Sequence, residues 1–224
     1  MCGRYNIALD KASPEMQEIF EELKQRYQDN DQRAELVKVK TAEIARTDTA
    51  PVLIMVDGVI RPVLMSFGIP QWDGKGVVAN ARRETVFAKP MFRKLILDQR
   101  CVVPTTGFFE WSHQGGRAVD KHKVTHADRS MMYLAGVYGH YKDRTGRDYM
   151  AYAVLTADAN ASISVIHDRM PVILKSPEER AAWLSDIDAA KEVLSRDDTE
   201  AYVLTMVEKP KKGQQKDLQL RMFE

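Results

Sequence analysis

The feature that most constrains this fold is a succession of short strand-like segments without a regular alternation of strands and helices. One pair forms a predicted hairpin: residues 52–56 and 59–63 are apolar and β-branched, and the Asp57-Gly58 pair between them suits a type I′ turn. Further strands are predicted at 1–9, 101–104, 107–111, 131–138, 149–156, 172–174 and 201–206. The pattern predicts an α+β fold whose mostly antiparallel sheet curls toward a barrel, with a few flanking helices.

Three segments carry helix signals. Residues 14–29 have apolar side chains three and four apart, with Ser13 as the expected N-cap before Pro14. Residues 176–179 read Ser-Pro-Glu-Glu, a capping box that opens a second helix, and a third is predicted at 188–195. The stretch after Lys209 is basic and poor in apolar residues, so we expect one domain over 1–208 and a disordered tail over 209–224.

Composition removes several classes of protein. The chain has 224 residues, 44% of them hydrophobic, which is enough to build one core without a disulfide or metal. Two cysteines exclude a disulfide framework, and the longest apolar runs are too short to span a bilayer. No secretory signal is visible, so the sequence favours a cytoplasmic protein. A monomer is the default expectation for the oligomeric state. The net charge of +1 argues neither for nor against nucleic acid as a partner.

Cys2 is the residue with the most distinctive chemistry. Because initiator methionine is normally removed before a small residue, we expect Cys2 to become the N-terminus. Its α-amine, with a reference pKa of about 7.7–8.0, is neutral far more often at pH 7 than a lysine amine. A neutral amine condenses with an aldehyde to a Schiff base, and the adjacent thiol can close a five-membered ring on the same carbon. The plainer alternative is a buried cysteine near the start of a strand.

Other segments gather reactive or DNA-binding residue types. Residues 80–85 read Asn-Ala-Arg-Arg-Glu-Thr, an amide beside two guanidiniums. Glu110 stands between large aromatic residues, where burial would raise its pKa toward the range of a general acid. His167 lies among charged residues before an extended run, and the 65–72 segment ends in Trp72. Taken singly, each is more simply explained by an ion pair, a turn cap or a solvated charge.

Together these segments resemble the SOS-response-associated peptidase (SRAP) family of abasic-site-crosslinking proteins. The similarity rests on Cys2-Gly3-Arg4-Tyr5 and on residues 80–85, 107–111 and 167–171, which follow the family's order at compatible spacing. The resemblance implies an SRAP-like domain that binds single-stranded DNA at an abasic site and shields the lesion through a covalent thiazolidine crosslink. It also implies lyase-like Schiff-base chemistry, autoproteolytic processing ahead of the new N-terminus, no cofactor, and association with the nucleoid when the protein is bound to DNA.

The resemblance assigns four catalytic roles. Cys2 would capture the aldehyde of the ring-opened sugar, and Asn80 would hold the sugar oxygen. Glu110 would act as acid and base in ring opening and amine activation. His167 would shuttle protons during Schiff-base formation and in reversal of the crosslink.

The resemblance also implies contacts to DNA. The expected phosphate contacts are Arg4, Arg82 and Arg83, and the expected base contacts or channel walls are Trp72 and Trp111. This division agrees with the general rule that arginines position the backbone while aromatic rings stack on unpaired bases.

The sequence departs from the family pattern in two places. Many members have Tyr-Asn-x-Ala-Pro where residues 43–48 read Glu-Ile-Ala-Arg-Thr-Asp, so DNA contacts from that loop do not carry over. Ser66-Phe67 also stands where a tryptophan commonly precedes the glycine. No metal is expected: His122 and His126 are four residues apart, but lysines flank His122 and no third ligand is evident, so both are predicted to be solvated.

Two other functions remain open at the level of the sequence. Glutamine-hydrolysing enzymes with an N-terminal nucleophile also begin Met-Cys-Gly, and in such an amidohydrolase Cys2 would attack an amide with its own amine as base. Arg4 and Tyr5 do not look like the apolar, glycine-containing start of those enzymes. A non-covalent single-stranded-DNA-binding module would explain the arginines and tryptophans but would leave Cys2 without a role.

Overall fold

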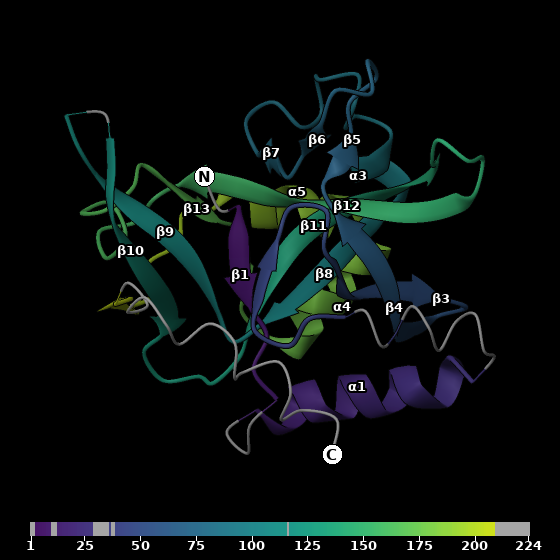
Figure 1. The fold of residues 1–224 in the computed structure, drawn as a ribbon, viewed down its shortest axis with the longest axis horizontal. Helices are drawn as coiled ribbons and strands as arrows, with labels where there is room; N and C mark the ends of the chain where they lie inside the picture. The colour runs from purple at the N-terminus through teal and green to yellow at the C-terminus, as the bar shows by residue number, and fades with distance from the viewer. Residues whose placement is uncertain (1–2, 10–12, 29–35, 37–38, 116, 209–224) are drawn as a thin grey trace.

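The centre of the molecule is a closed ring of five strands (Figure 1). The computed structural model describes residues 3–9, 13–28, 36, 39–115 and 117–208, so the tail predicted at 209–224 lies outside it. In order around the ring, the strands are β12 (Asp148–Asp158), β4 (Val59–Phe67), β3 (Thr49–Val56), β8 (Arg100–Thr105) and β11 (Met132–Lys142), and β11 pairs again with β12. Only β12 and β4 run parallel within this ring. The predicted α+β fold with a barrel-like, mostly antiparallel sheet is confirmed.

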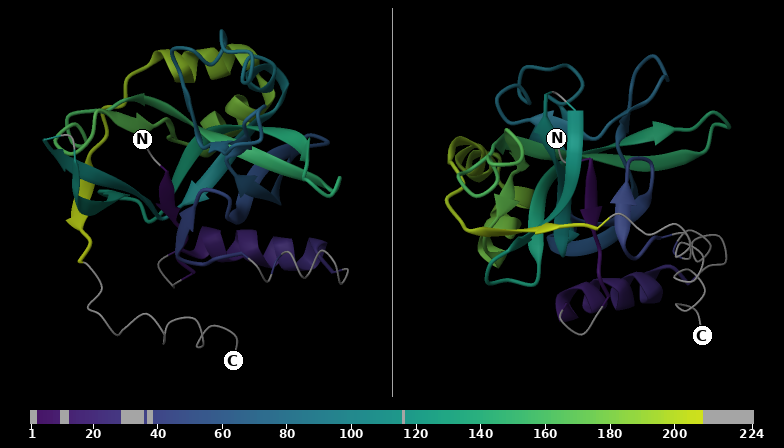
Figure 2. Two further views of the ribbon diagram at one scale, coloured as in Figure 1. Left: turned by 45° about the horizontal axis from the view of Figure 1, so that its top comes forward. Right: turned by 60° about the vertical axis from the view of Figure 1, so that its left-hand side comes forward.

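A second, antiparallel sheet flanks the barrel and carries the N-terminal strand (Figure 2). Its order is β15 (Tyr202–Met206), β10 (Arg117–His126), β9 (Gly107–Gln114), β1 (Arg4–Asn6) and β2 (Glu43–Ala45). Short strands extend the edges: β5 (Ile69–Pro70) pairs with β6 (Val77–Val78), β7 (Asn80–Arg82) and β13 (Arg169–Pro171) pair with β12, and β14 (Ile173–Leu174) pairs with β11.

Aromatic side chains join the two sheets. The hydroxyl groups of Tyr5 on β1 and Tyr152 on β12 are 2.5 Å apart, and both side chains are fully buried. Phe67 packs between them, with its ring centroid 5.2 Å from that of Tyr152 and 5.5 Å from that of Tyr5. Because these rings bury large area and satisfy each other's hydroxyls, they fix β1 against the barrel.

Four helices are described, and they cover the outside of the sheets. α1 (Pro14–Arg26) buries Met16, Phe20 and Leu23 against the barrel. The others are α3 (Leu95–Asp98), α4 (Pro177–Ser185) and α5 (Ile187–Ser195). No helix among the described residues is long and apolar enough to cross a membrane.

Local sequence signals were correct for the hairpin and for the positions of two helix caps. Asp57 and Gly58 have φ angles of 49° and 78°, as a type I′ turn requires. The Ser176 hydroxyl accepts a hydrogen bond from the Glu179 amide at 3.2 Å, which caps α4. Ser13 occupies the predicted N-cap position of α1 and Pro14 the first helical turn, although the Ser13 side chain makes no capping hydrogen bond.

The two histidines considered as metal ligands lie on β10, a strand that the sequence did not predict. His126 is not solvated: its Nε2 lies 3.3 Å from the Glu200 carboxylate, and its side chain is only 7% exposed. Within the described part of the chain, no group of three His, Cys, Asp or Glu residues could hold a metal ion.

Candidate active site

A cavity of about 480 Å³ opens at the end of the second sheet where β1 begins. Arg4 pairs with Ala45 on one side and Phe109 on the other, which places the next positions, Gly3, Arg46 and Glu110, around the same strand end. The cavity is lined by Gly3, Arg4, Ala45, Arg46, Glu110, Trp111, His113, Ala118 and His167. Cys2 lies outside the described residues; it is bonded directly to the Gly3 that lines this cavity.

Glu110 is the buried acid of the cavity. The residue is 2% exposed, although it lies on a strand at the cavity wall. Burial raises the pKa of its carboxyl group to about 7, and the Asp168 carboxylate adds to the increase. A group with this pKa is present in both protonation states at neutral pH, so it can donate and accept protons.

His167 faces Glu110 from the opposite wall. Its Nδ1 accepts a hydrogen bond of 3.0 Å from the Arg169 amide and also lies 2.8 Å from the Asp168 carboxylate. Nε2 lies 3.9 Å from Oε2 of Glu110, too far for a direct hydrogen bond. Burial lowers the pKa of His167, and the nearby His113 lowers it further, whereas Asp168 opposes the shift. A neutral imidazole and a carboxyl group can therefore exchange a proton through an atom bound between them.

A buried guanidinium with partly exposed carboxylate partners fixes the segment that carries His167. The Arg169 guanidinium donates to both carboxylate oxygens of Glu84 at 3.0 and 2.9 Å, and to Asp158 at 2.5 Å. It also donates to the carbonyl oxygen of Thr156 at 2.8 Å. Because Glu84 follows β7 and Arg169 begins β13, the pair joins the two motif segments that the sequence singled out, and it positions the turn at His167.

Replacing Arg169 with methionine is expected to lower the stability by about 1–2 kcal/mol, because the Thr156 carbonyl group loses its donor while the partly exposed carboxylates are left to solvent. This corresponds to a decrease in melting temperature of roughly 2–8 °C for a domain of this size, measured by thermal denaturation. Arg61→Met is the matched control, because Arg61 contacts Glu22 at 3.2 Å on the exposed surface. An equal decrease in both variants would contradict the positioning role.

The structure does not bring every predicted site residue into this cavity. Asn80 is half-buried on β7 beside Val154 of β12 and is not among the lining residues. Arg82 is exposed on the same strand. The Arg83 guanidinium instead contacts the carbonyl oxygen of Arg196 at 2.5 Å and Asp197 at 2.8 Å.

The two predicted base contacts differ in their setting. Trp72 lies between β5 and β6 with 95% of its surface exposed, whereas Trp111 on β9 forms part of the cavity wall. Trp72 can therefore contact a ligand only outside the cavity, whereas Trp111 can contact a ligand inside it.

Sequence reasoning missed two residues of the cavity wall with basic side chains. His113 lies on β9, and its ring centroid is 5.7 Å from that of His167 at an interplanar angle of 73°. Arg46 lies on the turn between β2 and β3, inside the segment that departs from the family pattern. His113 could have been found from the sequence, because it lies only three residues after Glu110. The predicted strand ended at residue 111, whereas β9 continues to Gln114 and includes His113.

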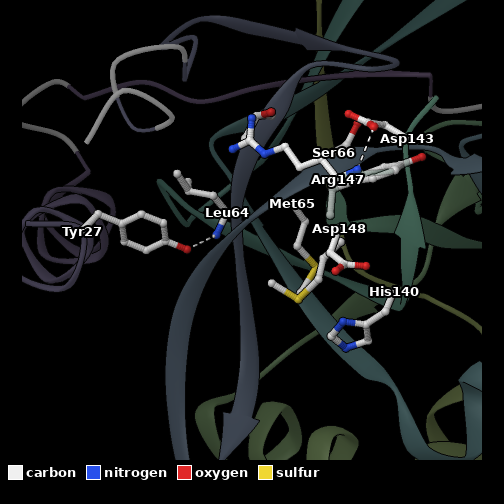
Figure 3. A pocket seen from close by; sticks show the side chains of 11 residues that line it. Tyr27, Leu64, Met65, Ser66, His140, Asp143, Arg147 and Asp148 are labelled. Carbon is white, nitrogen blue, oxygen red and sulfur yellow. Dashed lines mark hydrogen bonds between the residues drawn. The ribbon is translucent and has the colours of Figure 1, made fainter. Parts of the chain in front are cut away.

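A larger cavity, of about 550 Å³, lies elsewhere, where β4 and β12 diverge (Figure 3). Tyr27 closes one side and accepts a hydrogen bond of 3.0 Å from the Leu64 amide. Its carboxylates are engaged locally: Asp143 accepts from the Arg147 amide at 3.0 Å, and Asp148 contacts Lys142 at 2.8 Å. The raised carboxyl pKa and the facing histidine are features of the Glu110 cavity, so that cavity is the candidate active site.

Comparison with known proteins shows what the whole chain is similar to. A family model described as "SOS response associated peptidase (SRAP)" matches residues 1–210. The chain is 33% identical over 155 residues to the abasic site processing protein YoqW of Bacillus subtilis, covering 64% of this chain and 69% of that protein. It is 30% identical over 133 residues to the abasic site processing protein YedK of Escherichia coli, covering 59% and 58%. A crystal structure of a protein from Bacteroides thetaiotaomicron superposes with a TM-score of 0.73 at 25% identity, covering 92% of each chain.

Proposed function

Since this chain belongs to the SOS response associated peptidase family, we propose that it processes abasic sites by capturing them in single-stranded DNA as a covalent adduct of Cys2. Relatives of the chain carry the name abasic site processing protein. The observation that supports the proposal best is the meeting of Glu110 and His167 in one cavity whose wall includes Gly3. Cys2 is bonded to Gly3, and the proposal is that its amine and thiol act in this cavity.

The proposed reaction begins with the free α-amine of Cys2 once Met1 is removed. The amine adds to the aldehyde carbon of the ring-opened deoxyribose, and loss of one water gives a Schiff base. The thiol of Cys2 then adds to the same carbon while its proton passes to the nitrogen, which closes a thiazolidine ring. The net change is one new C–N bond, one new C–S bond and the release of one water.

The cavity supplies the proton transfers that these steps need. Opening the sugar ring and expelling water each require a proton donor, and amine addition requires a proton acceptor. Glu110, with a pKa of about 7, can fill both roles in turn. His167 holds its Nε2 on the Glu110 side and can pass a proton between the substrate and the carboxyl group. Asn80 as the group that holds the sugar oxygen, the autoproteolytic step and a monomeric state stay predictions.

Arg82→Ala is expected to weaken binding to undamaged single-stranded DNA by roughly fivefold and to reduce the slope of log affinity against log salt by about 0.7, as loss of one phosphate contact requires. Arg83→Ala is the matched control, because Arg83 contacts Asp197 and the Arg196 carbonyl group and should change stability more than the salt slope. Fluorescence anisotropy across a salt series measures both. An Arg82→Ala slope equal to that of the wild type would exclude a phosphate contact.

The test of the proposed function uses an oligonucleotide with one abasic site, before and after its aldehyde is capped with methoxyamine. We expect a heat-stable shifted band on a denaturing gel with the free aldehyde and no band with the capped one. Equal retention of both oligonucleotides under native conditions, with no stable band from either, would instead favour a non-covalent binding module. Hydrolysis of amides without any DNA adduct would favour the amidohydrolase.

A further inference from the structure

Glu43 lies between two cations at the edge of the candidate active site. Its Oε1 accepts a hydrogen bond of 2.6 Å from Nη1 of Arg4, and its Oε2 accepts one from Nζ of Lys121. Arg4 is on β1, Glu43 on the neighbouring β2 and Lys121 on β10, so this triad crosses the outer face of the second sheet. Arg4 itself lines the cavity.

Lys121 is held beside the cavity wall. Its Nζ lies 4.2 Å from the ring centroid of Phe109 and 5.5 Å from that of Trp111. Both are cation–π distances, which restrict the ammonium group to this face. Since Arg4 and Trp111 line the cavity, the Glu43 carboxylate and the Lys121 ammonium group lie directly beside residues of the cavity wall.

Glu43 is ionised in this setting. Burial opposes its charge, but hydrogen bonds from Lys121 and Arg4 prevail and hold the pKa of Glu43 below its ordinary value. The triad therefore carries a net charge of +1, where the two cations alone would carry +2. A phosphate that approaches the cations is repelled by the carboxylate and competes with it for the same donors.

We propose that Glu43 determines specificity by weakening the reversible attraction of undamaged single-stranded DNA. This inference rests on the proposed function. A covalent adduct is retained whatever the strength of the phosphate contacts, whereas an undamaged strand is retained only by them. With the Glu43 carboxylate between Arg4 and Lys121, a DNA strand is therefore retained for long only if it carries an abasic site that forms the adduct. Glu43 belongs to the 43–48 segment, where this chain departs from the family pattern.

The test compares Glu43→Gln with the wild type by fluorescence anisotropy on an undamaged single-stranded oligonucleotide across a salt series. Removal of the negative charge is expected to raise the affinity by roughly threefold to tenfold at low salt. The slope of log affinity against log salt should become steeper by about 0.7, the value for one more neutralised phosphate. The matched control is Glu22→Gln, which removes the same charge from a glutamate that is paired with Arg61. Glu22 is on α1, a helix that lies beyond the opposite end of β1 (Figure 1).

The outcomes separate the two proposals. If Glu43→Gln binds undamaged DNA no more tightly than the wild type while the wild type still forms adducts, the role of Glu43 is wrong and the proposed function stands. If affinity decreases, Glu43 serves instead to orient Arg4. If neither protein binds DNA or forms an adduct, both proposals fail. Should Glu43→Gln prove unfolded in a thermal melt, Glu43→Asp, whose shorter side chain withdraws the charge from the cations, is expected to show a smaller increase of the same sign.

Discussion

Replacing Cys2 with alanine is expected to reduce the covalent adduct with abasic single-stranded DNA to background. The variant keeps an α-amine, so a transient Schiff base can still form, but no thiol remains to close the ring on the same carbon. The effective concentration of a thiol on the adjacent carbon far exceeds that of any thiol in solution, so free thiols should not restore the adduct. The measurement is a heat-treated denaturing gel without a reducing agent for the imine.

The other cysteine provides the control. Cys101 on β8 is fully buried, and burial raises the pKa of its thiol well above the ordinary value. Cys101→Ala is therefore expected to form the adduct at the wild-type yield once its folding has been checked. A heat-stable adduct from Cys2→Ala, or its loss in a folded Cys101→Ala variant, would contradict the assignment of the nucleophile.

Glu110→Gln is expected to decrease the rate of adduct formation and to increase the stability of the protein. The rate of adduct formation should decrease by about 10²–10⁴-fold, because a glutamine amide can neither donate nor accept the protons that ring opening and imine formation require. At the same time the variant should be more stable than the wild type at pH 8, by about 2–3 kcal/mol, because it removes a charge from a buried position.

The sign of the stability effect follows from the direction of the pKa shift. The pKa of Glu110 is about 7 in the folded protein, against an ordinary value of 4.5. Below pH 4.5 both states are protonated, so the wild type and the variant should differ little. As the pH rises to 7 the unfolded chain loses its proton first, and the wild type loses stability that the variant keeps. The expected difference in melting temperature at pH 8 is roughly 5–10 °C.

Thermal melts at pH 5 and pH 8, together with single-turnover time courses, test the Glu110 prediction. Glu22→Gln on α1 is the control, since Glu22 is a surface group and should change neither quantity at either pH. A variant that is destabilised at pH 8 would show that the Glu110 carboxylate is a structural anion. A variant with the wild-type rate would exclude it from proton transfer.

Local patterns predicted those parts of the fold that short-range physics determines. The 52–63 hairpin follows from β-branched residues on either side of Asp57 and Gly58, and the α4 cap follows from Ser176 and Glu179. Closure of the barrel depends on the pairing of β12 with β4, a strand distant in sequence, and periodicity carries no such information. β10 was missed because its charged residues and histidines leave few apolar positions, so the strand shows no apolar alternation.

The candidate site was predictable in residue type but not in geometry. Glu110 and His167, which are far apart along the chain, do line one cavity. Arg83 could not be told apart from Arg82 by sequence, since only the fold places Asp197 beside it. Glu43 was read merely as a departure from a family pattern, because its partners Arg4 and Lys121 come together only across the sheet.

The most direct test of the central claim is the intact mass of the adduct after unfolding and alkylation with iodoacetamide. If Cys2 forms a thiazolidine, the mass should equal the protein without Met1 plus the oligonucleotide minus one water, with a single alkyl group on Cys101. Unreacted protein, with its two cysteines, should carry two alkyl groups. An adduct that carries two alkyl groups, or protein that has lost Met1 and forms no adduct, would contradict the account.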